Sequence, residues 1–218
     1  SASLALLMLT AVAHAQDKAK GIVYEDVNKN GKKDKKEKGL ANVLVSNGTD
    51  VIATDKNGNY ELNLTNDSPV FVIKPSGYQF HLDQYNLPKF YYLHKPLGSP
   101  QSKYQGVQPT GKLPKTLDFA LVPSKESDQF TAFAFGDPQA YTKEEIQYFI
   151  SGVVKEIDKN KAVFGISLGD LVGDDLSLHP DYKNAVKQIG LPWYNVMGNH
   201  DMNYDAKTDE LSDETYES

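Results

Sequence analysis

The chain has no cysteine among its 218 residues. Disulfide bonds are therefore excluded, and stability has to come from core packing and bound ions. An excess of positive charge is also lacking, because 23 lysine and arginine residues face 29 aspartate and glutamate residues, which gives a net charge of −6. An acidic chain is not expected to have nucleic acid as its main partner, since phosphate backbones attract basic surfaces.

Long apolar runs are missing too, apart from a short one near the N-terminus. Residues 4–12 are nearly all apolar, but the run is too short to span a membrane, and Ala-His-Ala at 13–15 fits the small-x-small rule for signal cleavage. The pattern predicts a signal peptide over residues 1–16, incomplete at its start; a buried N-terminal helix is the alternative. We expect the mature chain to be exported to the periplasm, the cell surface or the medium, with no transmembrane segment.

Residues 17–122 contain short β-like runs separated by turns. Strands are expected at 21–26, 41–47, 50–55, 59–64, 69–74 and 117–122. Asn47-Gly48 and Asn57-Gly58 tolerate positive φ and close hairpins. Several strands without a convincing helix predict a β-sandwich of the immunoglobulin or prealbumin type. Residues 76–115, rich in Pro, Gly and Tyr, are expected to form a long surface excursion.

A different pattern begins after a polar linker predicted at 123–129. Strands are expected at 130–136, 162–169 and 192–198, and helices over 142–157 and 180–190. Thr142 and Glu145 form a capping box at the start of the first helix. The order predicts two crossovers and a parallel sheet. The predicted fold class is therefore two-domain α+β, a β-sandwich followed by a βαβαβ α/β domain over residues 130–218.

Each predicted parallel strand ends in a polar motif. The motifs are GDPQ (136–139), GDLVGDD (169–175) and GNHD (198–201). Ligands bind outside the carboxyl ends of parallel strands. Carboxylate and amide oxygens and imidazole nitrogens are ligands for divalent metals. The sequence thus predicts that Asp137, Asp170, Asn199 and His200 meet at one edge of the sheet.

The three motifs, in this order, resemble those of the calcineurin-like metallophosphoesterase family over about residues 130–203. The resemblance implies a dinuclear centre of two divalent ions (Mn, Fe or Zn) that hydrolyses phosphate mono- or diesters. It implies that Asp137 and Gln139 bind the first metal, that Asp170 bridges and that Asn199 binds the second metal. It also implies that His200 lies beside the leaving-group oxygen or the scissile phosphate, with Asp201 orienting its ring.

Two positions depart from the family pattern. The family usually has histidine where this chain has Gln139, whose amide oxygen is a weaker, uncharged ligand. Gly173 stands where an acid is often found, and Asp174 and Asp175 are expected not to be ligands: they either contact the metal-site residues without binding metal or lie solvated in the loop. His179 is expected at the surface. Because the family's later metal-binding histidines are absent, we expect the chain to be a fragment that holds about half of the centre and is inactive alone.

A second predicted ion site lies near the N-terminus. Residues 26–37 match the calcium-loop template D-x-[DN]-x-[DN]-G-x5-E, with the sharp turn at Gly31. Its candidate positions are Asp26, Asn28, Asn30, Lys32, Asp34 and Glu37. The loop resembles those of B-type repeats in bacterial surface proteins and of the β domain that precedes secreted metallophosphoesterases. Five lysines and two neutral asparagines lower its expected calcium affinity, and a charged hairpin without an ion is the alternative.

The main functional prediction is an exported metal-dependent phosphoesterase, with a phosphoester substrate linked to carbohydrate or lipid. One alternative is an exported surface binding or adhesion module whose α/β domain is degenerate. Another is a carbohydrate-binding platform on the β-sandwich that uses Tyr78, Tyr85, Tyr91 and Tyr92.

Overall fold

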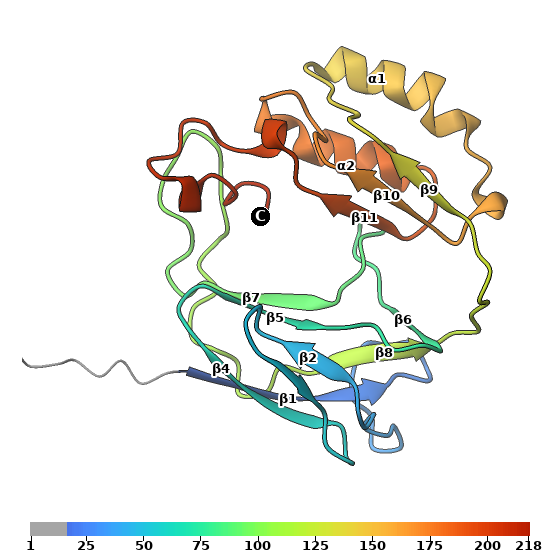
Figure 1. The fold of residues 1–218 in the computed structure, drawn as a ribbon, viewed down its shortest axis with the longest axis vertical. Coiled ribbons are helices and arrows are strands. Elements are labelled where there is room, and N and C mark those ends of the chain that lie inside the picture. The colour runs from blue at the N-terminus through green and yellow to red at the C-terminus, as the bar shows by residue number, and fades with distance from the viewer. Residues whose placement is uncertain (1–16) are drawn as a thin grey trace, which may run out of the picture.

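A computed structural model describes residues 17–218, and the predicted signal peptide lies outside them. A β-rich N-terminal part packs beside a smaller part that contains both α-helices (Figure 1). The mixed α+β architecture and the β-rich N-terminal domain are thereby confirmed. Among residues 17–218, neither α-helix has the length and apolar character needed to cross a membrane.

The N-terminal part consists of two four-stranded sheets. The first, in the order β4-β1-β8-β6, contains β1 (Asp17–Glu25), β4 (Asn59–Leu64), β6 (Tyr78–Phe80) and β8 (Phe119–Pro123). The second, in the order β3-β2-β5-β7, contains β2 (Leu44–Ser46), β3 (Val51–Ala53), β5 (Ser68–Val72) and β7 (Tyr91–His94). Buried and exposed residues alternate along β4, as a strand with one buried face requires. Buried side chains of both sheets form one cluster.

The expected long excursion over residues 76–115 is wrong in part, because it contains two strands. β6 pairs antiparallel with β8, and β7 pairs antiparallel with β5. Both strands are short and flanked by Gly, Pro and Lys, so their pairing depends on partners far along the chain rather than on a local pattern. Tyr91 and Tyr92 are neighbours on β7 and therefore point to opposite faces of its sheet.

The C-terminal part is built on a parallel sheet in the order β11-β10-β9. Its strands are β9 (Ala132–Phe135), β10 (Phe164–Leu168) and β11 (Trp193–Val196). Helix α1 (Lys143–Gly152) follows β9, helix α2 (His179–Lys187) follows β10, and both lie on the same side of the sheet (Figure 1). Their apolar residues pack with Trp193 and Phe135 in a second core cluster.

The predicted helix over 142–157 is too long. Thr142 caps α1 by accepting a hydrogen bond from Glu145 N, and Glu145 Oε2 accepts one from Tyr141 N at 2.6 Å. The α-helix ends at Gly152, and residues 17–218 also contain short 3₁₀ helices, of which only the first continues the apolar stripe. These are η1 (Val154–Glu156), η2 (Lys159–Lys161), η3 (Leu176–Leu178), η4 (Asn199–Asp201) and η5 (Asp209–Leu211).

The two parts of the chain are joined by direct contacts. Trp193 N donates to Asn86 O at 3.0 Å, so a loop between β6 and β7 is bonded to the start of β11. The segment after η4 runs beside the loop that follows β7 (Figure 1), where Lys95 Nζ lies 2.6 Å from Glu214 Oε1. The N-terminal domain therefore packs on the parallel-sheet domain beyond the covalent linker.

Candidate functional site

The loops that follow β9, β10 and β11 meet at the carboxyl edge of the parallel sheet. Gln139 N donates to Asp170 O at 2.8 Å, and His200 N donates to Asp170 Oδ1 at 3.0 Å. Gly198 lies against Asp170, because a Cβ at position 198 would be 2.1 Å from Asp170 Oδ1. These contacts place the three polar motifs side by side, with Asp170 in the middle.

Several candidate ligands have a strained backbone. Asp137, Gln139 and Asp170 have φ angles of 44°, 41° and 46°, and Asp174 has 66°. Residues other than glycine seldom have positive φ, because Cβ then crowds the backbone. Such strain persists only where the surrounding structure enforces it, and it clusters at functional sites. The loops after β9 and β10 are therefore held in conformations that their sequences do not prefer.

The residues at this edge include the donor types that bind divalent cations. Asp137 and Asn199 are exposed and form no side-chain hydrogen bond with the rest of residues 17–218. Gln139 donates through Nε2, which leaves Oε1 as an acceptor, and Asp170 Oδ2 has no hydrogen bond. Two carboxylates and two amides offer oxygen, which hard cations such as Mn²⁺ and Mg²⁺ prefer. Within residues 17–218, no group of three or more His, Asp or Glu side chains has metal-site geometry, so this set depends on its amides.

His200 is held by Asp174, which thus takes the first of the two roles expected for it, contact with a site residue rather than a solvated place in the loop. Its Nδ1 lies 2.7 Å from Asp174 Oδ1, and this hydrogen bond raises the pKa of His200 above its ordinary value. With Nδ1 engaged, Nε2 is the nitrogen available to a ligand. Asp174 lies four residues after Asp170, and its positive φ brings its carboxylate to the imidazole.

The expected role of Asp201 as the partner of His200 is wrong. Asp201 is fully buried, and its carboxylate accepts hydrogen bonds from Leu171 N at 2.9 Å and Gly198 N at 2.9 Å. His179 Nε2 lies 3.1 Å from Asp201 Oδ1, and His179 is buried rather than exposed at the surface, as we had expected. Burial alone would raise the pKa of Asp201, but the hydrogen bonds from His179 and the two amides outweigh it and lower the pKa. Asp201 thus ties the loops after β10 and β11 together.

Packing against Tyr141 explains why position 173 is a glycine. A Cβ there would lie 2.5 Å from Cδ1 of Tyr141, whose ring covers this turn. Tyr141 also accepts a hydrogen bond from Gln139 Nε2 at 3.1 Å. The two departures from the family pattern, Gln139 and Gly173, therefore contact the same side chain. Tyr141 was not among the residues predicted from the sequence, although its place two residues after Gln139 could have marked it as a contact of that side chain.

The N-terminal domain reaches this site through the loop after β7. Ser102 Oγ accepts a hydrogen bond from Asn203 Nδ2 at 2.7 Å, and Tyr104 OH donates to Asp174 O at 3.3 Å. Lys103 Nζ lies 3.3 Å from Asp205 Oδ2. Three consecutive residues of this loop thus contact segments on both sides of His200. Nothing in the sequence pointed to them, because they lie almost a hundred residues from the motif.

The predicted calcium loop folds around its own carboxylates. Asp26 is fully buried and accepts hydrogen bonds from Gly31 N at 2.7 Å and Asn30 N at 3.2 Å, while His81 Nε2 lies 2.7 Å from its Oδ2. Burial alone would raise the pKa of Asp26, but these hydrogen bonds lower it. Glu37 is also buried and accepts from Val27 N at 3.1 Å.

The other calcium-loop positions lie at the solvent side of the same loop. Asp34 Oδ2 accepts hydrogen bonds from Asn28 Nδ2 at 2.7 Å and Asn30 Nδ2 at 3.0 Å, and Lys32 is exposed. The five oxygen-bearing side chains of the template are therefore gathered in one loop.

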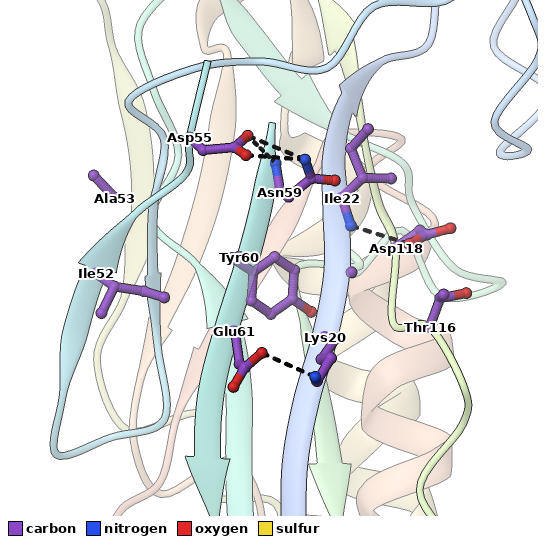
Figure 2. A pocket seen from close by; sticks show the side chains of 11 residues that line it. Lys20, Ile22, Ile52, Ala53, Asp55, Asn59, Tyr60, Glu61, Thr116 and Asp118 are labelled. Carbon is purple, nitrogen blue, oxygen red and sulfur yellow. Dashed lines mark hydrogen bonds and ion pairs between the residues drawn. The ribbon is translucent and has the colours of Figure 1, made fainter. Parts of the chain in front are cut away.

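A cavity of about 660 Å³ lies on the N-terminal domain, away from the sheet edge. Figure 2 shows that its polar groups are largely paired with each other. Asp55 accepts hydrogen bonds from Asn59, Asp118 Oδ1 accepts one from Ile22 N at 3.0 Å, and Lys20 pairs with a glutamate of β4. Few unpaired donors or acceptors remain to recognise a ligand, so this cavity is not the candidate site.

Comparison with known proteins found a match to the N-terminal domain. Residues 27–107 match the family model described as the N terminal of calcineurin-like phosphoesterase. The match supports the calcineurin-like phosphoesterase family and lies wholly within the β-rich domain. No curated protein matches the chain.

Proposed function

We propose that the protein is a metal-dependent phosphoesterase of the calcineurin-like type, acting on phosphate mono- or diesters. The observation that supports the proposal is the contact between the loops after β9, β10 and β11, where Gln139 N and His200 N both donate to Asp170. The family match adds separate support, because residues 27–107 share no position with the polar motifs. In the same interpretation, the N-terminal domain is an immunoglobulin- or prealbumin-like sandwich, and β9-α1-β10-α2-β11 belongs to the catalytic fold.

Each residue of the site has a proposed role. Asp170, in the middle of the site, would bridge two divalent ions, with Asp137 and Gln139 on one and Asn199 on the other. Such ions, when bound, lower the pKa of a bound water and stabilise charge on phosphoryl oxygens. His200, fixed through Nδ1 by Asp174, presents Nε2 to the leaving-group oxygen and can donate a proton or hydrogen bond to it.

The finer proposals concern substrate and location. We infer an exported protein, in the periplasm, at the cell surface or in the medium, whose phosphoester substrate is linked to carbohydrate or lipid. The predicted leader at residues 1–16 supports export. The acidic net charge argues against a nucleic-acid substrate.

The test uses the full-length protein with bis-p-nitrophenyl phosphate and Mn²⁺ or Zn²⁺. Asp170→Asn should lower Mn²⁺ affinity and nitrophenol release by at least about 100-fold, because the loss of a ligand should cost more than the 10- to 100-fold lost with a partner of a ligand. Asp205→Asn, at an exposed acid of the neighbouring loop, should change neither.

Unchanged activity in Asp170→Asn would contradict the proposed mechanism. A wild-type protein without metal-dependent hydrolysis would instead favour a surface binding or adhesion module with a degenerate α/β domain. The uncharged Gln139, which stands in place of a histidine, would then explain the missing hydrolysis.

We further propose that residues 26–37 bind calcium to stabilise the N-terminal domain. Asp26, Asn28, Asn30, Asp34 and Glu37 supply oxygens at the template positions, with the backbone carbonyl of Lys32 at the seventh place. Extracellular modules of this kind bind calcium only weakly, which suits a loop with five lysines.

Calcium at ten times the dissociation constant should stabilise the domain by about 1.4 kcal/mol. For a chain of this size, that corresponds to a rise in Tm of about 3–6 °C. Glu37→Gln should abolish the rise, whereas Glu156→Gln, at an exposed acid outside the loop, should leave it intact. An equal rise with magnesium, or in Glu37→Gln, would show that the effect does not come from this loop.

A further inference from the structure

We propose that Tyr141 is a positioning residue of the metal centre, which orients the Gln139 amide so that its oxygen faces the cation. The inference rests on the proposed function, because it assigns a partner to one of the proposed ligands. Tyr141 lies outside the three polar motifs, between the loop after β9 and the start of α1.

Three contacts define the position of Tyr141. Its hydroxyl accepts the hydrogen bond from Gln139 Nε2 at 3.1 Å. Its ring covers Gly173 so closely that a Cβ there would come within 2.5 Å of it. On the other side, its ring centroid lies 6.3 Å from that of His200 in an edge-to-face arrangement. The side chain therefore touches the loops after β9, β10 and β11.

The hydrogen bond addresses a weakness of glutamine as a metal ligand. A carboxylate presents oxygen whichever way it turns, whereas an amide presents oxygen in one orientation and an NH₂ group in the other. Because the Tyr141 hydroxyl accepts a hydrogen bond from Nε2, the Oε1 atom is the one left to bind a cation. Histidines that bind metals depend in the same way on a second group that fixes their orientation.

The contact with Gly173 explains why the two departures from the family pattern occur together. An acidic side chain at position 173 and the Tyr141 ring would occupy the same space, since even a Cβ collides with it. With glycine at 173, the ring can lie flat over the turn and its hydroxyl reaches Gln139. Gln139, Tyr141 and Gly173 therefore form one interdependent arrangement.

The test measures Mn²⁺ binding by electron paramagnetic resonance, on the full chain and without substrate. Tyr141→Phe keeps the ring but removes the hydroxyl, and should weaken Mn²⁺ binding about 10-fold, the lower end of the cost of losing a partner of a metal ligand. Gly173→Ala should weaken binding similarly by displacing the ring. Tyr148→Phe, an exposed tyrosine on α1, is the matched control and should have no effect.

A double mutant shows whether Tyr141 affects Mn²⁺ binding through Gln139. In a Gln139→Ala background, Tyr141→Phe should cause no further loss, because the amide that it orients is gone. A full additional loss there, or unchanged binding in Tyr141→Phe while Gln139→Ala weakens it, would overturn the proposal.

A metal-free readout separates this proposal from the proposed function. The Gln139 side-chain NH₂ resonances should shift in Tyr141→Phe and stay in place in Tyr148→Phe; no shift in Tyr141→Phe would overturn the proposal. If Asp170→Asn left Mn²⁺ binding unchanged, the proposed function would fail, and the amide signals would still decide whether Tyr141 holds Gln139.

Discussion

Replacing Asp201 with alanine should lower the free energy of unfolding by about 3–5 kcal/mol, because several buried hydrogen-bond donors would each lose their acceptor at about 1–3 kcal/mol. The carboxylate is fully buried and accepts hydrogen bonds from Leu171 N, Gly198 N and the His179 ring. Alanine would leave these donors buried without an acceptor. Urea unfolding of wild type and variant, at one temperature and pH, measures the difference.

Two further variants show whether the loss belongs to this carboxylate. Asp201→Asn keeps one oxygen but turns an NH₂ group toward the amides, so it should cost about 1–3 kcal/mol. Asp205→Ala removes an acid that pairs on the surface with Lys103 and should change stability by about 0.5 kcal/mol or less. If Asp201→Ala had the same free energy of unfolding as wild type and only slowed phosphoester hydrolysis, Asp201 would act as the catalytic partner of His200 after all.

The contrast between Asp201 and Asp174 shows what the sequence can predict of this site. The order of strands and helices places the loops after β9, β10 and β11 at one edge, and the structure brings Gln139, Asp170 and His200 into contact there. Which acid faces the His200 ring depends on a φ of 66° at Asp174. The residue next in sequence was the natural guess, but the η4 turn sends its side chain into the core.

Long-range packing explains the other errors. β6 and β7 are three and four residues long, and each is defined by a partner strand rather than by its own pattern. His179 precedes Pro180 at the start of α2, a position typical of surface residues, yet Asp201 accepts its hydrogen bond inside the domain. Local patterns predicted the elements, whereas the pairs that connect distant loops needed coordinates.

The loop after β7 gives the N-terminal domain a direct part in the candidate site. Ser102 contacts Asn203, three residues after His200, and Tyr104 contacts Asp174, whose carboxylate holds the His200 ring. The domain that matches the calcineurin-like N-terminal family model therefore supports the loops on which the proposed chemistry depends. A buried ion pair close to this loop holds the two domains together and can be tested separately.

Lys95→Ala should lower the free energy of unfolding by about 3–5 kcal/mol, because it leaves a buried acid without its partner. Lys95 Nζ lies 2.6 Å from Glu214 Oε1 and 2.8 Å from Asp67 Oδ2, and the side chains of Lys95 and Glu214 are each only 8% exposed. Burial alone would lower the pKa of Lys95, but the hydrogen bonds that its ammonium donates to Asp67 and Glu214 raise it above its ordinary value of 10.5. The ion pair's contribution should therefore be complete below pH 10.5 and be lost as the pH rises through the folded pKa.

Lys103→Ala is the matched control, since Lys103 also joins the two domains but its ion pair with Asp205 is exposed, so that solvent screens it and its loss should cost far less. Chemical denaturation gives the two losses, and hydrogen exchange over residues 203–218 shows where they arise. Lys95→Ala should speed exchange in that segment, because Glu214 would keep only its hydrogen bond with Ser99. Equal losses in both variants would mean that burial does not distinguish the two lysines. Unchanged exchange in Lys95→Ala would mean that Lys95 does not hold the segment after η4 against the N-terminal domain.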